Sequence, residues 1–552
     1  MEANPVRIIQ YFDGTKQSVI PLFQRPYTWE KEKWLTLWDD IMTHYSADES
    51  TTHFLGAVVS IPVKTVPVGV NKHLIIDGQQ RLTTLAIILA VLRDIVDPKT
   101  ADRIDDYLIN RHYDGPDRLK LLPTQGDRDV YSLLVVDRAL STTDGRVKGA
   151  YEFFRQKLTA DHDLETIDPL RFLETIEQSL QVVMINLGDA DDPYLIFESL
   201  NAKGEPLTQA DLVRNYVLMK FRQSLGSGGD QERIYVSYWN PLQISLGTNL
   251  TYFLRHYCMR DGTNVERGAV YTAIKRLISD KADDSEIEAE LKIMTRLGGY
   301  YARFIDPSKE ADLEVKARLS AFGELDVTTG YPLLLRLFDS ESRGAITEAD
   351  FKKCLFLIES FVVRRVICAI PTNSLGKMFT QWSKDYKEAD VVQWLHTKLS
   401  SGSGNARWPV DSAFKTAFQT AEQYGRKATR HVLASLERAF EHKEPVDLTV
   451  ATIEHVMPQE LTSEWRAELG TASEELHAIL LHTFGNLTLT GYNSELGNLS
   501  FEQKKAQLSN SHIELNRWIC KQDRWDEKTI IARAAMLSEA ASKLWVGPEY
   551  NQ

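Results

Sequence analysis

The residues with the clearest chemical potential lie near the C-terminus. Glu454 and His455 close a short apolar segment typical of a strand, and two asparagines, Asn486 and Asn493, follow further along the chain. A nuclease with one metal ion uses a carboxylate, an imidazole that titrates near neutral pH, and amide oxygens to hydrolyse a phosphodiester. The sequence therefore predicts chemistry on nucleic acid. His455 taken alone would more simply be a histidine hydrogen-bonded at a strand end.

A second polar group lies in the N-terminal part. Residues 77–81 read Asp-Gly-Gln-Gln-Arg and stand between an apolar strand and an apolar, buried helix at 82–92. Gly78 lets a phosphate approach the backbone, the first helical turn offers free N–H groups, and Arg81 can form charge-assisted hydrogen bonds. Asp77 can hold a metal ion or orient a water molecule. A structural turn with an aspartate cap explains the same pattern.

An extended, proline-containing run at residues 20–29 precedes this group. Its Arg25 lies beside aromatic residues, and such an arginine on a loop can bind a phosphate or stack on an unpaired base. Tyr27 and Trp29 are candidates for contacting a modified base. Packing is an equally open interpretation for both. The helix predicted at 30–41 buries one aromatic and aliphatic face.

A third segment, residues 196–212, combines a turn with a helix start. Thr208 and Asp211 have the spacing of a capping box. Asn201 and Lys203 stand in the preceding turn, where Lys203 offers a phosphate contact and Asn201 favours unusual backbone angles. A purely structural turn is the simpler interpretation of this segment alone.

Composition sets limits on the class of protein. The 552 residues, 43% of them hydrophobic, suffice for several cored domains, and a net charge of −13 weakens nonspecific nucleic-acid binding without excluding local basic patches. The four cysteines are scattered, which favours reduced thiols over disulfides or a zinc knuckle. We find no apolar run that could span a bilayer and no signal peptide, so we expect a cytoplasmic protein without a membrane partner.

Two glycine- and serine-rich stretches, 224–230 and 400–405, divide the chain into three parts. The first part mixes strand-like runs at 58–61, 73–76 and 182–185 with helical patterns. The second is helical by periodicity and carries no chemical motif. We therefore predict a predominantly helical α+β protein with an N-terminal α/β domain.

Five motifs occur along the chain in this order: IPLFQRPYTW, IIDGQQRLTTL, FESLNAKGEPLTQADL, IEHVMPQ and FGNLTLT. In this combination the chain resembles the single-chain GmrSD-type, type IV-like restriction endonucleases, which depend on DNA modification. The resemblance covers roughly residues 5–225 and 405–545. It implies a ParB/sulfiredoxin-like domain at 1–225 that binds and hydrolyses GTP or another nucleoside triphosphate, a helical linker domain at 226–404, and a ββα-metal His-Asn-His (HNH) nuclease domain at 405–552.

The resemblance also implies roles in the nuclease centre. His455 is the general base, and Asn486 fixes the loop that orients it. Glu454 and Asn493 are the ligands of a Mg²⁺ or Mn²⁺ ion, although Asn498 competes with Asn493. Many members of the wider superfamily carry an aspartate before the base and a final histidine as ligand, so this chain departs from their pattern at both ligand positions.

Further contacts follow from the same resemblance. Lys504 and Lys505 lie where the helix that begins at Asn493 is expected to end, and either can contact the scissile phosphate, as can Arg533. The nucleotide site is assigned to Asp77, Gly78, Gln79, Gln80, Arg81, Asn201 and Lys203, of which Asp77 and Arg81 take part in hydrolysis. The contacts to DNA and its modification are assigned to Gln24, Arg25, Tyr27, Trp29, Lys504 and Lys505.

We therefore expect an antiphage endonuclease in which nucleotide binding and hydrolysis regulate a metal-dependent nuclease. Its partner is double-stranded DNA with a modification; relatives sense glucosylated hydroxymethylcytosine or phosphorothioate. Homo-oligomerisation is left open. Two alternatives remain: a nucleotide-gated DNA-binding module with an inactive nuclease, and a nuclease that cuts RNA or acts as an abortive toxin.

Overall fold

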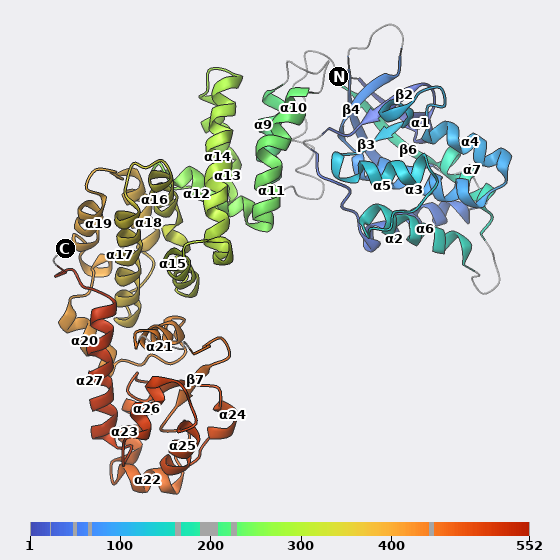
Figure 1. Cartoon of the computed structure of the whole chain (residues 1–552). Helices are drawn as coiled ribbons and strands as arrows, with labels where there is room; N and C mark the ends of the chain where they lie inside the picture. The colour runs from blue at the N-terminus through green and yellow to red at the C-terminus, as the bar shows by residue number, and fades with distance from the viewer. Residues whose placement is uncertain are drawn as a thin grey trace. The chain divides into compact units, whose positions relative to one another are not determined.

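The computed structural model describes residues 2–21, 24–47, 52–63, 69–160, 167–187, 208–221, 229–440 and 446–550 (Figure 1). The chain forms two compact units: Met1–Pro241 with Gly268–Lys292, and Leu242–Arg267 with Ile293–Gln552. The division into three domains stays a prediction. Of the helices in these described ranges, none is long and apolar enough to cross a membrane.

A six-stranded mixed sheet organises the first unit. Its strands are β1 (Glu2–Arg7), β2 (Lys16–Val19), β3 (His53–Pro62), β4 (Asn71–Asp77), β5 (Leu121–Leu122) and β6 (Leu180–Asn186), in the order β1-β6-β3-β4-β2-β5. β1 pairs antiparallel with β6 and β3 with β4, whereas the other neighbours run parallel. The three predicted strand runs lie within β3, β4 and β6, so the mixed α/β character of this part is confirmed.

Four helices of the first unit pack against a central helix, α3 (Gln79–Ile95). The helices of this unit are α1 (Ile9–Phe12), α2 (Lys31–Tyr45), α3, α4 (Pro98–Leu108), α5 (Gln125–Val135), α6 (Arg146–Thr159), α7 (Pro169–Ser179), α9 (Gln209–Lys220), α10 (Gly229–Ile234) and α13 (Val270–Ser279). Because α3 is apolar on nearly all sides, it is buried nearly throughout and packs against α4, α5, α6 and α7 (Figure 1). The predicted burial of 82–92 is confirmed, as is the buried face of α2, where Trp38 stacks on Phe172 of α7.

The second unit is mostly helical. Its helices are α12 (Leu250–Met259), α15 (Leu313–Glu324), α16 (Tyr331–Ser342), α17 (Glu348–Ile367), α18 (Leu375–Lys384), α19 (Val391–Ser400), α20 (Asp411–Thr420), α21 (Ala428–Arg438), α22 (Ser463–Leu469), α23 (Ser473–Leu480), α24 (Asn493–Leu496), α25 (Phe501–Leu508), α26 (Glu514–Cys520) and α27 (Glu527–Leu544). Two short strands, β7 (Thr452–His455) and β8 (Leu487–Thr490), pair antiparallel near its end. α11 (Asn240–Leu246) and α14 (Asp284–Ile305) have residues in both units. The prediction of a helical middle is confirmed.

An ionic network centred on the buried side chains of His431 and Glu359 ties four segments of the second unit together. His431 of α21 contacts Glu324 of α15 through Nδ1 (3.0 Å) and Glu359 of α17 through Nε2 (3.3 Å). Arg318 and the indole N–H of Trp545 also donate to Glu359. Burial alone would lower the pKa of His431, but its bonds to both carboxylates outweigh burial and raise it. Burial opposes ionisation of Glu359, yet His431 and Arg318 hold its pKa at about 2.

We predict that this network makes the stability of the second unit depend on pH. The folded-state pKa of His431 lies above its unfolded value, so its contribution is complete below about pH 6.5 and is lost as the pH rises through the folded-state pKa. His431→Gln should lower the free energy of unfolding by about 2 kcal/mol at low pH and by less at high pH. Thermal unfolding from pH 5.5 to 9 measures this difference. The exposed His512→Gln serves as the control, and a difference that does not change with pH would contradict the prediction.

Candidate functional site

The predicted nuclease residues gather around the two short strands. In β7 and β8, Glu454 faces Thr488 and His455 faces Leu487 across the ladder. The predicted strand that ends at His455 is therefore confirmed. α24 begins at Asn493 as expected but ends at Leu496, because Gly497 follows with a positive φ of 37° that interrupts the helix. Lys504 and Lys505 therefore belong to the separate helix α25, which corrects their expected place at the end of the helix of Asn493.

The side chain of Asn486 fixes the turn that follows His455. Its Oδ1 accepts hydrogen bonds from the backbone N–H of Met457 (2.7 Å) and the indole N–H of Trp525 (3.0 Å). Its Nδ2 donates to the carbonyls of Met457 (3.0 Å) and Leu481 (2.9 Å). These four bonds use the full capacity of a carboxamide that is closed to solvent. The backbone two residues after His455 is thereby held in place.

α27 supports the same loop from its other side. The fully buried guanidinium of Arg533 donates to the carbonyls of Phe484, Gly485 and Leu487, and burial lowers its pKa to about 9. A Cβ on Gly485 would lie 2.5 Å from the carbonyl oxygen of Ile530, so only glycine allows this close approach. The expected phosphate contact of Arg533 is wrong for this position, because the side chain is used inside the core.

Glu454 forms a buried ion pair. Its Oε1 accepts a hydrogen bond from Lys504 Nζ at 2.6 Å, with the two side chains 7% and 1% exposed, and Nζ also donates to the carbonyl of His455 (2.7 Å). Burial raises the pKa of Glu454, against the opposing effect of the Lys504 charge. Lys505 donates to the carbonyl of Gln522. Both lysines thus bind protein groups here, and their predicted phosphate contacts stay predictions.

His455 lies in an aromatic cluster that sequence reasoning missed. Its Nε2 is 3.0 Å from Nδ1 of His482, and the ring of Tyr424 meets it edge-on with 4.3 Å between centroids. Tyr424 also stacks on His482 at an interplanar angle of 10°. Burial, together with the nearby His482 and Lys504, lowers the pKa of His455 to about 4. The imidazole is therefore neutral at pH 7, which is the form that accepts a proton.

Asn493 lies beside the first residues of β7. Its Nδ2 donates to Thr452 Oγ1 (3.0 Å) and to the carbonyl of Ile453 (3.1 Å), one residue before Glu454. Across the described ranges, no three His, Cys, Asp or Glu side chains converge as a metal site. The predicted ligands Glu454 and Asn493 offer oxygen donors, the type that Mg²⁺ and Mn²⁺ prefer, and their binding of a cation stays a prediction. The competing Asn498 donates to Glu460 (3.4 Å) instead.

In the first unit, the structure brings two predicted motifs together. Gln24 donates to the carbonyl of Ile76 (2.9 Å), and Gln80 accepts from the N–H of Thr28 (2.8 Å) and donates to the carbonyl of Pro26 (3.1 Å). The side-chain amides of these two glutamines thus join the loop of residues 24–29 to the end of β4 and the start of α3. Packing accounts for the positions of both glutamines.

Tyr27 is part of the same junction. Its hydroxyl lies 2.7 Å from Thr84 Oγ1 and accepts from the indole N–H of Trp34 (2.8 Å), and the side chain is buried in the core. Trp29 packs half-buried against that core, and Arg25 is also half-buried. The packing interpretation accounts for Tyr27, so Arg25 and Trp29 are the more accessible members of the predicted DNA contact.

The predicted turn from strand to helix is confirmed. β4 ends at Asp77, Gly78 has a φ of 94°, and α3 follows; a Cβ on Gly78 would lie 2.9 Å from a methyl carbon of Val58. Arg81 donates to the carbonyl of Ala57 (2.9 Å). Burial lowers the pKa of Arg81, and the charge of Asp77 partly opposes this.

Gln79 is buried at this turn, and its Oε1 has no hydrogen-bond partner among the described atoms. The turn therefore combines a cation, a carboxylate, a helix start and an unsatisfied amide oxygen. Asn201 and Lys203, also assigned to this site, lie outside the described residues.

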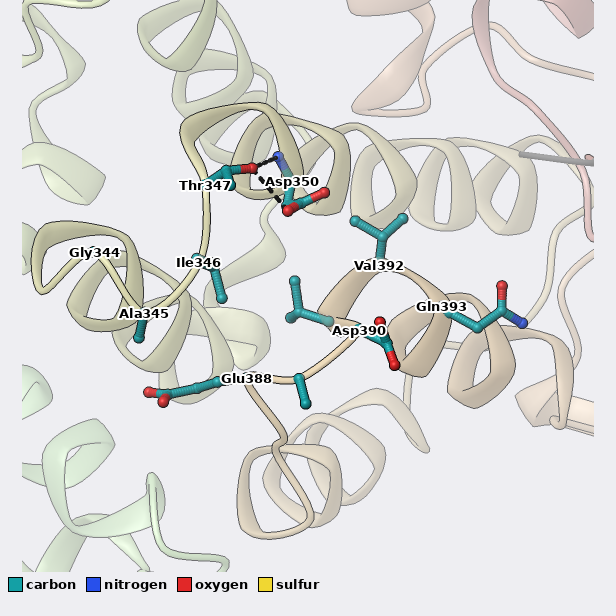
Figure 2. Close-up of a pocket in the computed structure, with 11 residues that line it drawn as sticks. Gly344, Ala345, Ile346, Thr347, Asp350, Glu388, Asp390, Val392 and Gln393 are labelled. Atoms are coloured by element: carbon teal, nitrogen blue, oxygen red, sulfur yellow. Dashed lines mark hydrogen bonds between the residues drawn. The ribbon is translucent and has the colours of Figure 1, made fainter.

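A pocket in the second unit lies between the segments 344–350 and 388–393 (Figure 2). Asp350, Glu388 and Asp390 line it, and Figure 2 shows Asp350 bonded to Thr347 at the start of α17. Three carboxylates would repel a phosphate, so this pocket does not suit a nucleotide or nucleic acid.

Two protein-family models match this chain, one in its N-terminal part and one in its C-terminal part. Residues 8–218 match the family model described as GmrSD restriction endonuclease, N-terminal domain. Residues 408–540 match the model described as GmrSD restriction endonucleases, C-terminal domain. The first match includes the turn at Asp77, and the second includes the strand end at His455. No curated protein matches the chain.

We predict that Asn486→Ala lowers the free energy of unfolding of the second unit by about 2 to 4 kcal/mol, because it leaves the Met457 and Trp525 N–H groups buried without an acceptor. Denaturant unfolding measures the change. Asn498→Ala, an exposed asparagine in the same region, should change stability by less than about 0.5 kcal/mol. Equal effects of the two substitutions would show that Asn486 does not clamp the loop.

Proposed function

The chain belongs to the GmrSD family of restriction endonucleases, and from this premise we propose that its C-terminal part is a metal-dependent nuclease of the His-Asn-His type. Membership makes the protein a DNA endonuclease of restriction and defence. The N-terminal part binds and hydrolyses a nucleoside triphosphate, GTP or another. It activates cleavage by the C-terminal part when the DNA is modified. One observation carries the nuclease assignment: His455 lies at a strand end, and the backbone that follows it is fixed by Asn486.

In this mechanism His455 takes a proton from the water that attacks the phosphodiester. Its pKa of about 4 keeps the ring unprotonated in the free protein. A bound phosphate beside the ring favours the imidazolium and raises that pKa again, so the base becomes stronger as the substrate binds. Asn486 holds the backbone at Met457, and this keeps the position of His455 relative to the phosphate constant.

Glu454 and Asn493 would hold the Mg²⁺ or Mn²⁺ ion. When bound, the ion neutralises charge on the phosphate and on the departing oxygen. Lys504 already offsets the charge of Glu454 in the folded chain, so the lysine and the ion would share this carboxylate. The same ion pair favours the alternative in which the nuclease is inactive and the chain is a nucleotide-gated DNA-binding module.

The nucleotide site is proposed at the turn of Asp77 and Gly78, with Gln79 and Arg81 and, by resemblance, Gln80, Asn201 and Lys203. The unsatisfied Oε1 of Gln79 and the N–H groups at the start of α3 support a ligand there. We assign recognition of the DNA modification to the neighbouring loop of residues 24–29. Arg25 and Trp29 are the side chains of this loop that are accessible enough to contact it. Because this loop is bonded to the turn through Gln80, a nucleotide at the turn can change how the loop meets DNA.

His455→Ala should abolish cleavage of plasmid DNA in the presence of Mg²⁺, with a loss of about 10²- to 10⁴-fold, because general-base catalysis disappears. The test compares modified and unmodified plasmids, and His512→Ala is the control since this histidine is exposed. Retained cleavage by His455→Ala would refute the assignment of His455 as the general base. A wild-type protein that binds DNA without cutting it would favour the inactive-nuclease alternative.

Arg81→Ala should abolish nucleotide hydrolysis and also reduce modification-dependent cleavage, because the guanidinium is the cation of the proposed site. Phosphate release and plasmid cleavage are measured on the same preparation, with Arg103→Ala, an exposed arginine of the same unit, as control. Loss of hydrolysis with unchanged modification-dependent cleavage would separate the two activities and refute the coupling.

A further inference from the structure

The partner of His455 is itself held by a rigid connection. The carbonyl of His482 accepts hydrogen bonds from the N–H groups of Gln423 (2.8 Å) and Tyr424 (3.3 Å). Gln423 is buried, its carbonyl accepts from Thr429, and its side chain donates to the carbonyl of Ile367. The segment between α20 and α21 therefore holds the ring of Tyr424 in a fixed position against the two imidazoles.

The surroundings of His482 determine which ring nitrogens carry protons. Its Nε2 lies 4.0 Å from the carboxylate of Glu422, which favours a proton on Nε2. An imidazole with its one proton on Nε2 has its lone pair on Nδ1, and Nδ1 of His482 lies 3.0 Å from His455 Nε2. His455 must therefore donate its own Nε2–H across this contact. The lone pair of His455 is left on Nδ1.

We propose that His482 is a positioning residue that sets the tautomer of His455 and so makes Nδ1 the nitrogen that accepts the proton from water. This rests on the proposed function of His455 as general base. The water proton moves to Nδ1 while Nε2 keeps its hydrogen. The hydroxide then forms a bond to phosphorus, the bond to the leaving oxygen breaks, and that oxygen takes a proton from another water.

The order Glu422, His482, His455 also explains how the ring of His455 is oriented. The Nε2 of His455 faces Nδ1 of His482, whose other nitrogen lies 4.0 Å from the carboxylate of Glu422. Tyr424 stacks on His482 and meets His455 edge-on, which keeps both rings from rotating. An acceptor beside the second nitrogen of a histidine base fixes the tautomer of that base, which is what the buried aspartate does in hydrolytic triads.

Two substitutions at one position test the inference. His482→Asn keeps an acceptor oxygen where Nδ1 stood, whereas His482→Leu removes it. His482→Leu should lower the kcat of plasmid cleavage about 10- to 100-fold with little change in KM, and His482→Asn should stay within a few-fold of wild type. His512→Leu is the surface control. Equal losses in the two His482 variants would overturn the proposal.

The tautomer is read directly in the full-length protein labelled with ¹⁵N-histidine. The wild type and His482→Asn should show His455 protonated on Nε2, and His482→Leu should lose this preference. A wild-type His455 protonated on Nδ1 would overturn the proposal. This measurement does not depend on cleavage. If His455→Ala cuts as fast as wild type, the assignment of His455 as general base is refuted. The ¹⁵N chemical shifts then still show whether His455 donates a hydrogen bond to His482.

Discussion

The carboxamide of Asn486 is satisfied on all sides at a place that water does not reach. Two backbone groups of Met457, the carbonyl of Leu481 and the indole of Trp525 are its partners. Each buried N–H group left unsatisfied would cost about 1 to 3 kcal/mol, so the turn after β7 has one stable arrangement. This constraint fixes the backbone that follows His455, and the roles proposed at the C-terminal site depend on that fixed backbone.

The N-terminal site is built on the same principle. The side-chain amide of Gln80 bonds the backbone on both sides of Tyr27, so a loop and a turn that are distant in sequence move as one piece. Arg81 then lies against the backbone of β3, where Gly56 leaves room for the guanidinium. In both units, therefore, an amide side chain holds a loop and the charged or titratable groups lie beside it. In both sites, hydrogen bonds between a side-chain amide and the backbone position the loop.

Local pattern predicted the elements well. The strand that ends at His455, the turn at Gly78, the buried face of α2 and the capping box at Thr208 all depend on residues close in sequence, and the structure confirms each of them. Partners distant in sequence could not be predicted in this way. His482 carries no signal beyond its place just before Asn486, and the burial of Lys504 depends on α25 folding back onto Glu454. The family match explains which residue types are present, whereas tertiary packing decides which of them meet.

Hydrogen exchange at single residues tests the central constraint most directly. The N–H of Met457 donates to the Asn486 side chain, and that of Val456 donates to the Asn486 carbonyl. If the carboxamide fixes the turn after His455, both amides should exchange only through unfolding of the surrounding unit and be as slow as those of its buried helices. Exchange of the Met457 amide as fast as in an exposed loop would contradict the account, because the backbone after the general base would then not be fixed.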